Sequence, residues 1–271
     1  MKTKLVILIL LFIETGSMVT AQQTYFNQIF DINRRSFLGT INDIVQDPQG
    51  YIWLAIQNNG GIVRYDGSRM APPYRNEPNN PNSPSGQGPE CLVTDSTGII
   101  WIGYWGTGLD RFDPESGKFK NFRHAESNPT SLSSDTVRTV LIDHSGNLWI
   151  GTHRGLDLFN SKTGQFTHYS HSDSDPSSLS CSNISIIYED RERTIWIGTG
   201  RVDENKIDGG LNRFDRNTGK FTRYMHNPND PQSLKNDKVS AIFEDSRGRF
   251  RAVATPGSHH LRERRYWMYG R

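Results

Sequence analysis

Apolar and polar residues alternate along this chain in short stretches separated by turn residues, a pattern typical of β-strands. Glycines at 146, 155 and 164 mark tight turns in the best example, because Gly readily adopts a positive φ. Between these turns, β-branched and aromatic residues predict strands over residues 137–142, 148–152, 156–160 and 165–170. These four strands, joined by tight turns, predict one antiparallel sheet.

The same unit recurs along the chain with a nearly constant period. Each copy has an Asp six residues before a Trp, and the Trp residues are Trp53, Trp101, Trp149 and Trp196, at spacings of 48, 48 and 47 residues. A second segment with an aromatic residue follows each Trp, as in Gly108-Leu-Asp-Arg-Phe112-Asp113. A strand-rich repeat of about 40 to 50 residues predicts a β-propeller. The predicted fold is therefore all-β, with four-stranded antiparallel blades.

The repeated Trp and Phe residues are expected to pack between neighbouring blades, because each buries a large apolar area. The repeated Asp could suggest calcium, but its short turn supplies too few oxygen ligands for that ion. An Asp that accepts hydrogen bonds from its own turn explains the pattern better. The turn that begins with the repeated Asp has Gly as its fourth residue in the other copies, but the fourth copy has Arg193 there. If the φ of Arg193 is positive, this residue should lower the stability of the fold by about 1 kcal/mol.

The N-terminus has the features of a secretory signal peptide. Basic residues come first, residues 5–13 are uninterruptedly apolar, and small residues precede position 22. Nine apolar residues are too few to span a bilayer as a helix, which needs about 20. We therefore predict a cleaved signal peptide over residues 1–21 and a periplasmic or secreted protein. Within the following segment, 22–40, residues 25–30 are a candidate outer strand that would close the propeller.

Composition excludes several classes of protein. Only 34% of residues are hydrophobic, and Gly and Pro are abundant at 25 and 13, which favours many turns over long helices. A net charge of +2 gives no reason to expect nucleic-acid binding. The two cysteines, Cys91 and Cys181, occupy different repeat positions, so a disulfide between them is not expected.

The repeat pattern breaks near the C-terminus. Residues 239–250 begin a fifth blade, but Arg251 stands where the next Trp is expected. Residues 251–271 hold five Arg and one Glu and keep nothing of the pattern. A basic tail can form a nucleic-acid or membrane patch, but the sudden loss of register favours a truncated or frame-shifted end. We therefore expect propeller repeats over 41–250, about four full blades and part of a fifth, in an incomplete propeller.

The repeats resemble the two-component regulator propeller repeat, through Gly-x-Leu/Ile-Trp-Ile-Gly-Thr and the following Gly-Leu-Asn/Asp-Arg-Phe-Asp. The resemblance covers residue 41 to about residue 249. It implies the exported sensor region of a hybrid two-component histidine kinase, whose seven-bladed propellers precede a transmembrane helix and a kinase core, with a possible homodimer at full length. Because no kinase core is present here, we expect no phosphotransfer by this chain, and membrane attachment only through the missing C-terminal anchor.

Function is expected on the blade face that carries the turns between second and third strands and the loops between blades, because loops carry most binding residues. Aromatic rings beside polar groups suit sugars, which offer a face for stacking and hydroxyls for hydrogen bonds. The candidate ligand-binding residues are Asn58, Asn59, Tyr104, Trp105, His153, Arg154, Arg201, Asp203 and Glu204. Trp105 could equally pack on the adjacent blade. We expect an oligosaccharide or other small ligand, with no cofactor, metal or nucleic acid.

His124, His171 and His226 recur at one repeat position, where the first copy has Asn76. Equivalent positions on different blades rarely converge on one metal ion, so turn-forming hydrogen bonds explain the pattern more simply. The chain also lacks a Gly-x-Ser-x-Gly elbow, a His-Glu-x-x-His motif and a phosphate loop. The alternative functions are an exported propeller enzyme, such as a polysaccharide or cyclic-ester lyase, and a structural or adhesion module.

Overall fold

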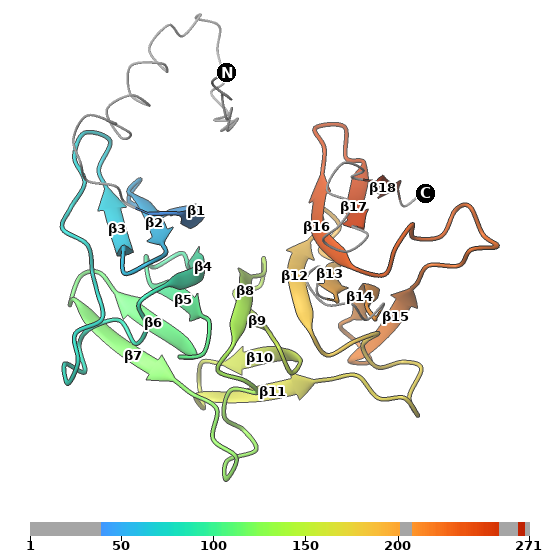
Figure 1. Ribbon diagram of the computed structural model, residues 1–271, viewed down its shortest axis with the longest axis horizontal. Coiled ribbons are helices and arrows are strands. Elements are labelled where there is room, and N and C mark those ends of the chain that lie inside the picture. Colours follow the sequence, from blue (N-terminus) through green and yellow to red (C-terminus); the bar gives the residue numbers. More distant parts are fainter. Residues whose placement is uncertain (1–38, 201–207, 255–264, 269–271) are drawn as a thin grey trace, which may run out of the picture. The chain divides into compact units, whose positions relative to one another are not determined.

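A computed structural model describes residues 39–200, 208–254 and 265–268, which form five antiparallel sheets (Figure 1). The predicted signal peptide, the candidate closing strand at 25–30, and Arg201, Asp203 and Glu204 lie outside the described residues. Within the described residues, no helix has the length and apolar character needed to cross a membrane. The cysteines Cys91 and Cys181 are both free, as expected.

Each sheet consists of strands that are consecutive in the chain. The first sheet contains β1 (Ile41–Gln46), β2 (Ile52–Ile56) and β3 (Gly61–Tyr65), and the second contains β4 (Pro89–Thr94), β5 (Ile100–Tyr104), β6 (Leu109–Asp113) and β7 (Lys118–Phe122). The third contains β8 (Val137–Ile142), β9 (Leu148–Thr152), β10 (Leu156–Asn160) and β11 (Gln165–Tyr169). The fourth contains β12 (Ile184–Glu189), β13 (Ile195–Thr199), β14 (Gly210–Asp215) and β15 (Lys220–Tyr224), and the fifth contains β16 (Val239–Glu244), β17 (Phe250–Ala254) and β18 (Arg265–Met268).

The middle three sheets are the predicted four-stranded blades, and the sheets are blades of an incomplete β-propeller. The first repeat differs from the prediction, because its fourth strand is reduced to isolated bridges of Tyr65 with Met70 and of Ile62 with Tyr74. Pro72 and Pro73 lie between Met70 and Tyr74 and have no N–H to donate to a ladder. The first sheet therefore has three regular strands.

The fifth sheet extends beyond residue 250, where the sequence pattern placed the end of the repeats. β17 continues to Ala254, and β18 pairs with it as a third strand. Phe250 and Ala252 are buried on one side of β17 even though Arg251 replaces the expected Trp. Strand pairing depends on backbone hydrogen bonds and does not require the Trp of the repeat. Residues 251–254 and 265–268 therefore belong to the fifth sheet, whereas the sequence pattern assigned them to a basic tail.

Neighbouring sheets are joined by one aromatic contact that repeats at every junction. A buried Trp of one sheet meets a Phe of the next, and the ring centroids are 5.7 Å apart for Trp53–Phe112, 5.1 Å for Trp101–Phe159, 5.1 Å for Trp149–Phe214 and 4.5 Å for Trp196–Phe250. The four indoles are at most 5% exposed. The predicted packing role of the Trp residues is confirmed. At the last junction the partner ring comes from the second strand of the sheet instead of the third.

The repeated Asp residue fixes the tryptophan as well as its own turn. The carboxylates of Asp47, Asp143 and Asp190 each accept the indole N–H of their own repeat, at 2.8, 2.9 and 2.9 Å. Their other oxygens accept backbone N–H groups within the turn, which confirms the predicted turn role. In the fifth repeat the Arg251 guanidinium replaces the indole and lies 3.6 Å from the Asp245 carboxylate.

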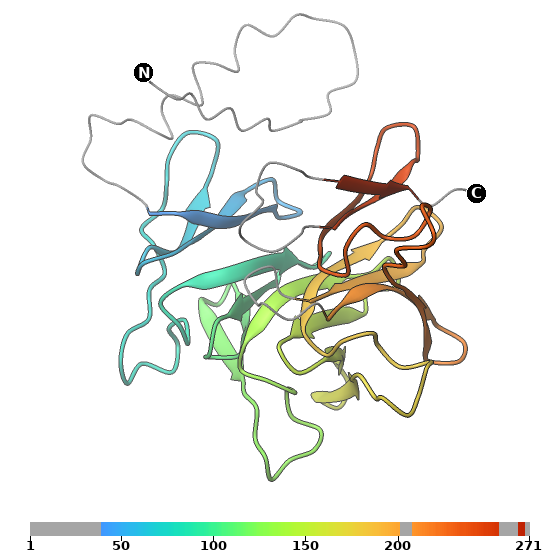
Figure 2. The same ribbon diagram turned by 45° about the vertical axis from the view of Figure 1, so that its right-hand side comes forward.

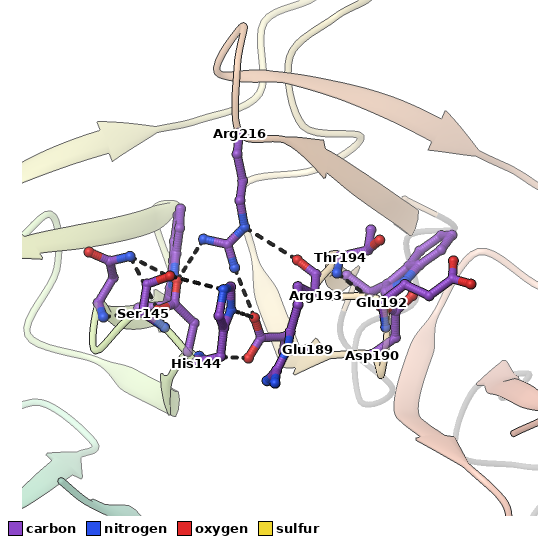
Figure 3. Close-up of polar contacts among 12 residues, drawn as sticks. His144, Ser145, Glu189, Asp190, Glu192, Arg193, Thr194 and Arg216 are labelled. Atoms are coloured by element: carbon purple, nitrogen blue, oxygen red, sulfur yellow. Dashed lines mark hydrogen bonds and ion pairs between the residues drawn. The ribbon is translucent and has the colours of Figure 1, made fainter. Parts of the chain in front are cut away.

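At the junction of the third and fourth sheets, Asp143 also joins a polar network with Arg216 and Glu189, the two residues labelled at its centre in Figure 3. Arg216, from the turn between β14 and β15, donates to Asp143 at 2.7 Å and to Glu189 at 3.0 Å. Burial by itself raises the pKa of Asp143, but hydrogen bonds from Trp149, Arg216 and Asn147 outweigh it and hold that pKa at about 2. The network therefore stabilises the ionised carboxylate that orients the inter-sheet tryptophan.

Arg193, which stands where the other copies of this turn have Gly, has a φ of +68°. Its backbone is therefore in the left-handed region. An L side chain in this region costs roughly 1 kcal/mol. Arg193→Gly should therefore raise the free energy of unfolding by about 1 kcal/mol in urea denaturation. The matched control is Glu192→Gly in the same turn, where φ is not positive. There the added Gly increases the entropy of the unfolded chain and should lower the free energy of unfolding. Equal destabilisation by both substitutions would contradict the assignment.

Arg216→Met should lower the free energy of unfolding at neutral pH by about 1 to 2 kcal/mol, because the Asp143 carboxylate loses its cationic donor. The folded pKa of Asp143 lies below its unfolded value, so its stabilisation is present above about pH 4 and disappears as the pH falls towards 2. Urea titrations at several pH values should therefore show the difference between variant and wild type shrinking in acid. The exposed Arg213→Met is the control, and a pH-independent difference for Arg216→Met would refute this account.

Candidate functional site

Two turns and one loop meet where the second sheet adjoins the third. The Asp135 carbonyl accepts the N–H of Gly108 at 2.9 Å, and Trp105 forms an isolated bridge with Thr136. The N–H of His153, in the turn of the third sheet, donates to the Thr136 carbonyl at 3.1 Å. These bonds place the turns of both sheets against the same inter-sheet loop. Trp105 and His153 therefore both lie against residues 135–136 of this loop, in agreement with their sequence-based placement on one face.

Trp105 is exposed, whereas its neighbour Tyr104 is not. The Trp105 side chain is 49% exposed, and the Arg138 guanidinium lies 5.3 Å from the centroid of its ring. Tyr104 is the last residue of β5 and is 1% exposed in the cluster that contains Trp53 and Phe112. Adjacent residues at a strand end point to different sides, so only one of this pair can face solvent. The prediction of Tyr104 as a ligand contact is corrected, because burial removes it from the surface.

Three arginines, Arg123, Arg138 and Arg154, contact the turns or the loop that meet here. Arg123 donates to the Asp135 carboxylate at 2.7 Å. Partial burial opposes ionisation of Asp135, but its bonds with Arg123 and the His124 N–H prevail and lower its pKa. The Nη1 atom of Arg154 lies 3.4 Å from Nε2 of His124. Across residues 39–200, 208–254 and 265–268, neither Arg138 nor Arg154 forms an ion pair. Both guanidinium groups can therefore meet an anionic group of a ligand.

Asn58 and Asn59 lie in the turn between β2 and β3, and both are exposed. Their φ angles are +57° and +64°, a conformation that Asn tolerates better than most residues. The backbone bonds here are local, from the Gln57 N–H to the Thr40 carbonyl and from the Gly60 N–H to the Gln57 carbonyl. Turn conformation therefore explains both Asn residues without a ligand.

The recurring histidines fasten the loops between sheets, as predicted. Their Nδ1 atoms lie 2.8, 2.6 and 2.6 Å from a Leu carbonyl oxygen in the pairs His124–Leu132, His171–Leu179 and His226–Leu234. In the first repeat Asn76 Nδ2 donates to the Pro84 carbonyl at 2.7 Å. Each bond joins two residues eight positions apart and so restricts the loop backbone between them.

A second set of loop anchors was missed by sequence reasoning. Asp110, Asp157 and Asn212 are 0% exposed and occupy the same position of the third strand in their sheets. Each side-chain oxygen accepts a loop N–H at 2.8 Å, in the pairs Asp110–Ser85, Asp157–Ser133 and Asn212–Ser180. The available signal was an Asp or Asn that directly follows Gly-Leu in each of these three repeats. These anchors hold the loops of the candidate face against the sheets.

At the opposite strand ends, Ser145, His144 and Glu189 form a line that resembles a nucleophile, a base and an orienting carboxylate (Figure 3). Ser145 Oγ lies 3.0 Å from His144 Nε2, and His144 Nδ1 lies 2.5 Å from Glu189 Oε1. The N–H groups of Ser145 and Gly146 both donate to Asp143, so neither is available to hold an oxyanion. The line therefore lacks the donors that acyl transfer requires.

The next junction shows what this contact does. The Arg191 N–H donates to the Glu244 carboxylate at 3.0 Å, just as the His144 N–H donates to Glu189 at 2.8 Å. The carboxylates that end β12 and β16 thus each accept a turn N–H from the preceding sheet. Because the contact recurs with Arg in place of His, we interpret it as a structural bond between sheets.

Comparison with solved structures supports the propeller fold. Virginiamycin B lyase from Staphylococcus aureus is similar with a TM-score of 0.55 and 13% identity, over 86% of this chain and 71% of its own. The extracellular domain of a putative hybrid two component system from B. thetaiotaomicron gives a TM-score of 0.48 and 20% identity, over 81% of this chain. This chain spans only 39% of that domain. No curated protein matches the chain.

The repeats themselves match a family model. The match covers residues 131–154 and 178–201, and the family is described as Two component regulator propeller. Both segments run from the loop before a first strand through the Trp-bearing second strand. They include Trp149 and Trp196, the residues that make the inter-sheet contacts described above. Residues 131–154 and 178–201 therefore match two-component regulator propeller repeats.

Proposed function

We propose that this chain is the ligand-sensing region of a two-component sensor and that it binds an oligosaccharide outside the cytoplasm. The repeat match at 131–154 and 178–201 supports the sensor assignment, and the signal-peptide features of residues 1–21 support export to the periplasm or beyond. One observation carries the binding proposal. Trp105 exposes 49% of its surface in a turn whose backbone is fixed by hydrogen bonds to the inter-sheet loop.

The surroundings of Trp105 favour a sugar over a purely apolar ligand. An indole gives a flat surface for the C–H face of a sugar ring, while nearby polar groups bind its hydroxyls. Arg138, Arg154 and His153 supply such donors within the same cluster of turns and loop. Because buried anchors hold the loops, little chain entropy is lost when a ligand binds.

In this proposal the chain binds its ligand without chemical turnover. A longer sensor would carry the membrane anchor and the kinase core, and dimerisation would belong to that longer protein. Binding would then act by favouring one arrangement of the repeats over another, since a ligand shifts an equilibrium only through unequal affinity for its states.

Trp105→Ala should weaken oligosaccharide binding about ten-fold or more, because the stacking surface is lost. The measurement is calorimetric titration of the full chain with oligosaccharides of xylan, galactan and polygalacturonate. Phe243→Ala is the control, because Phe243 is another exposed aromatic residue, on β16 of the fifth sheet. The Phe243→Ala variant should bind the oligosaccharide as tightly as the wild type does.

Circular dichroism should confirm that both variants keep the β fold. The proposal fails if no oligosaccharide shows saturable binding, or if Trp105→Ala binds as tightly as the wild type. Release of shortened or unsaturated sugars during the titration would instead identify the chain as a lyase.

A further inference from the structure

The first strand of every sheet contains a bulge at the same repeat position. In each case one extra residue interrupts the register with the second strand, between Ile41 and Asp43 in the first sheet and between Val137 and Thr139 in the third. The extra residues in the five sheets are Asn42, Glu90, Arg138, Ser185 and Ser240. All five are polar. A bulge redirects a side chain out of the regular alternation and often occurs beside a binding site.

These bulges lie close to one another, because the first strands of successive sheets are in contact (Figures 1 and 2). Two of the short polar residues bind the next sheet. Asn42 donates to the Pro89 carbonyl at 2.9 Å, and the Ser185 hydroxyl donates to the Val239 carbonyl. At these two junctions the bulged residue therefore has a structural role.

Arg138 departs from that role. Its guanidinium does not bond to the next first strand but lies over the ring of Trp105, in the preceding sheet. Within the described part of the chain, that guanidinium has no hydrogen-bond acceptor and no carboxylate partner. Arg138 is half-buried, and a guanidinium presents five N–H donors that need acceptors. The donors of Arg138 thus face the candidate site without a protein partner.

The chemistry of these groups defines the ligand. A guanidinium binds a carboxylate through two parallel hydrogen bonds, which are stronger than neutral ones. Arg154 adds a second cationic group near the same loop. Glu90, the bulged residue of the second sheet, is half-buried and can accept hydrogen bonds from sugar hydroxyls. Trp105 keeps 49% of its surface exposed beside the Arg138 guanidinium, so a sugar ring and its carboxylate can be bound together.

We infer that the ligand is an acidic oligosaccharide and that Arg138 binds the carboxylate of a uronate residue. This inference rests on the proposed function of the same site and specifies its substrate class. The bulge supplies the specificity, because it directs the side chain of a first strand towards the exposed ring of the neighbouring sheet.

The test compares each acidic ligand with a neutral one of the same backbone. Oligomers of galacturonate and of glucuronate are titrated into the full chain beside their methyl esters, which keep the ring and hydroxyls and lose only the charge. The acids should bind at least ten-fold more tightly than the esters. The preference should decrease as salt is raised, because charge interactions at an exposed site are screened.

Three variants assign the preference to Arg138. Arg138→Gln should bind the acid about ten-fold more weakly and leave the affinity for the ester unchanged. Arg138→Lys should retain part of the preference, because it keeps the charge and loses the two-pronged geometry. Arg213→Gln, which removes the same charge from an exposed position on β14, should behave as the wild type.

The outcomes separate this inference from the proposed function. Equal binding of acid and ester, or an unchanged preference in Arg138→Gln, overturns the acidic ligand while leaving a neutral sugar sensor in place. If only neutral oligosaccharides bind, the acidic ligand is likewise overturned and the proposed sugar sensor remains. If no sugar of either kind binds, both the inference and the proposed function fail.

Discussion

The contact between a buried indole and an aromatic ring of the next sheet is the interaction on which the rest of this structure depends. A four-stranded sheet is stable only when its apolar faces are covered, and here each sheet is covered by its neighbour. The tryptophan fills the space between them, and at Trp53, Trp149 and Trp196 an Asp of the same repeat accepts the indole N–H, so that this buried donor is paired. Repetition of this one contact builds the chain sheet by sheet.

The two ends of the strands then take different roles. At one end, short Asp turns and a carboxylate–turn bond tie successive sheets together, as between His144 and Glu189. At the other end the connections are longer, yet they are anchored by buried Asp or Asn side chains and by the recurring His residues. Loops usually carry function because they vary, and binding needs them to be held in place. The second end satisfies both conditions.

A repeat protein provides its own internal comparison, and that comparison is what locates the candidate site. All five first strands have the same bulge, so the backbone does not require a long charged side chain at this position. Asn42 and Ser185 fill the position with short groups that bond the next sheet, whereas Arg138 extends to Trp105. A side chain that departs from the structural role of its copies is free to serve a ligand.

The sequence by itself determined most of the strands, the turns and the packing role of the tryptophans, because these follow from periodicity and from residues close in the chain. Only the tertiary structure decided that β18 adds a third strand to the fifth sheet, since its pairing with β17 joins segments with no shared pattern. It also decided that Tyr104 is buried while Trp105 is exposed, and that Arg138 stands on a bulge. Register and bulges depend on the partner strand, so a local pattern cannot specify which side of a sheet a residue faces.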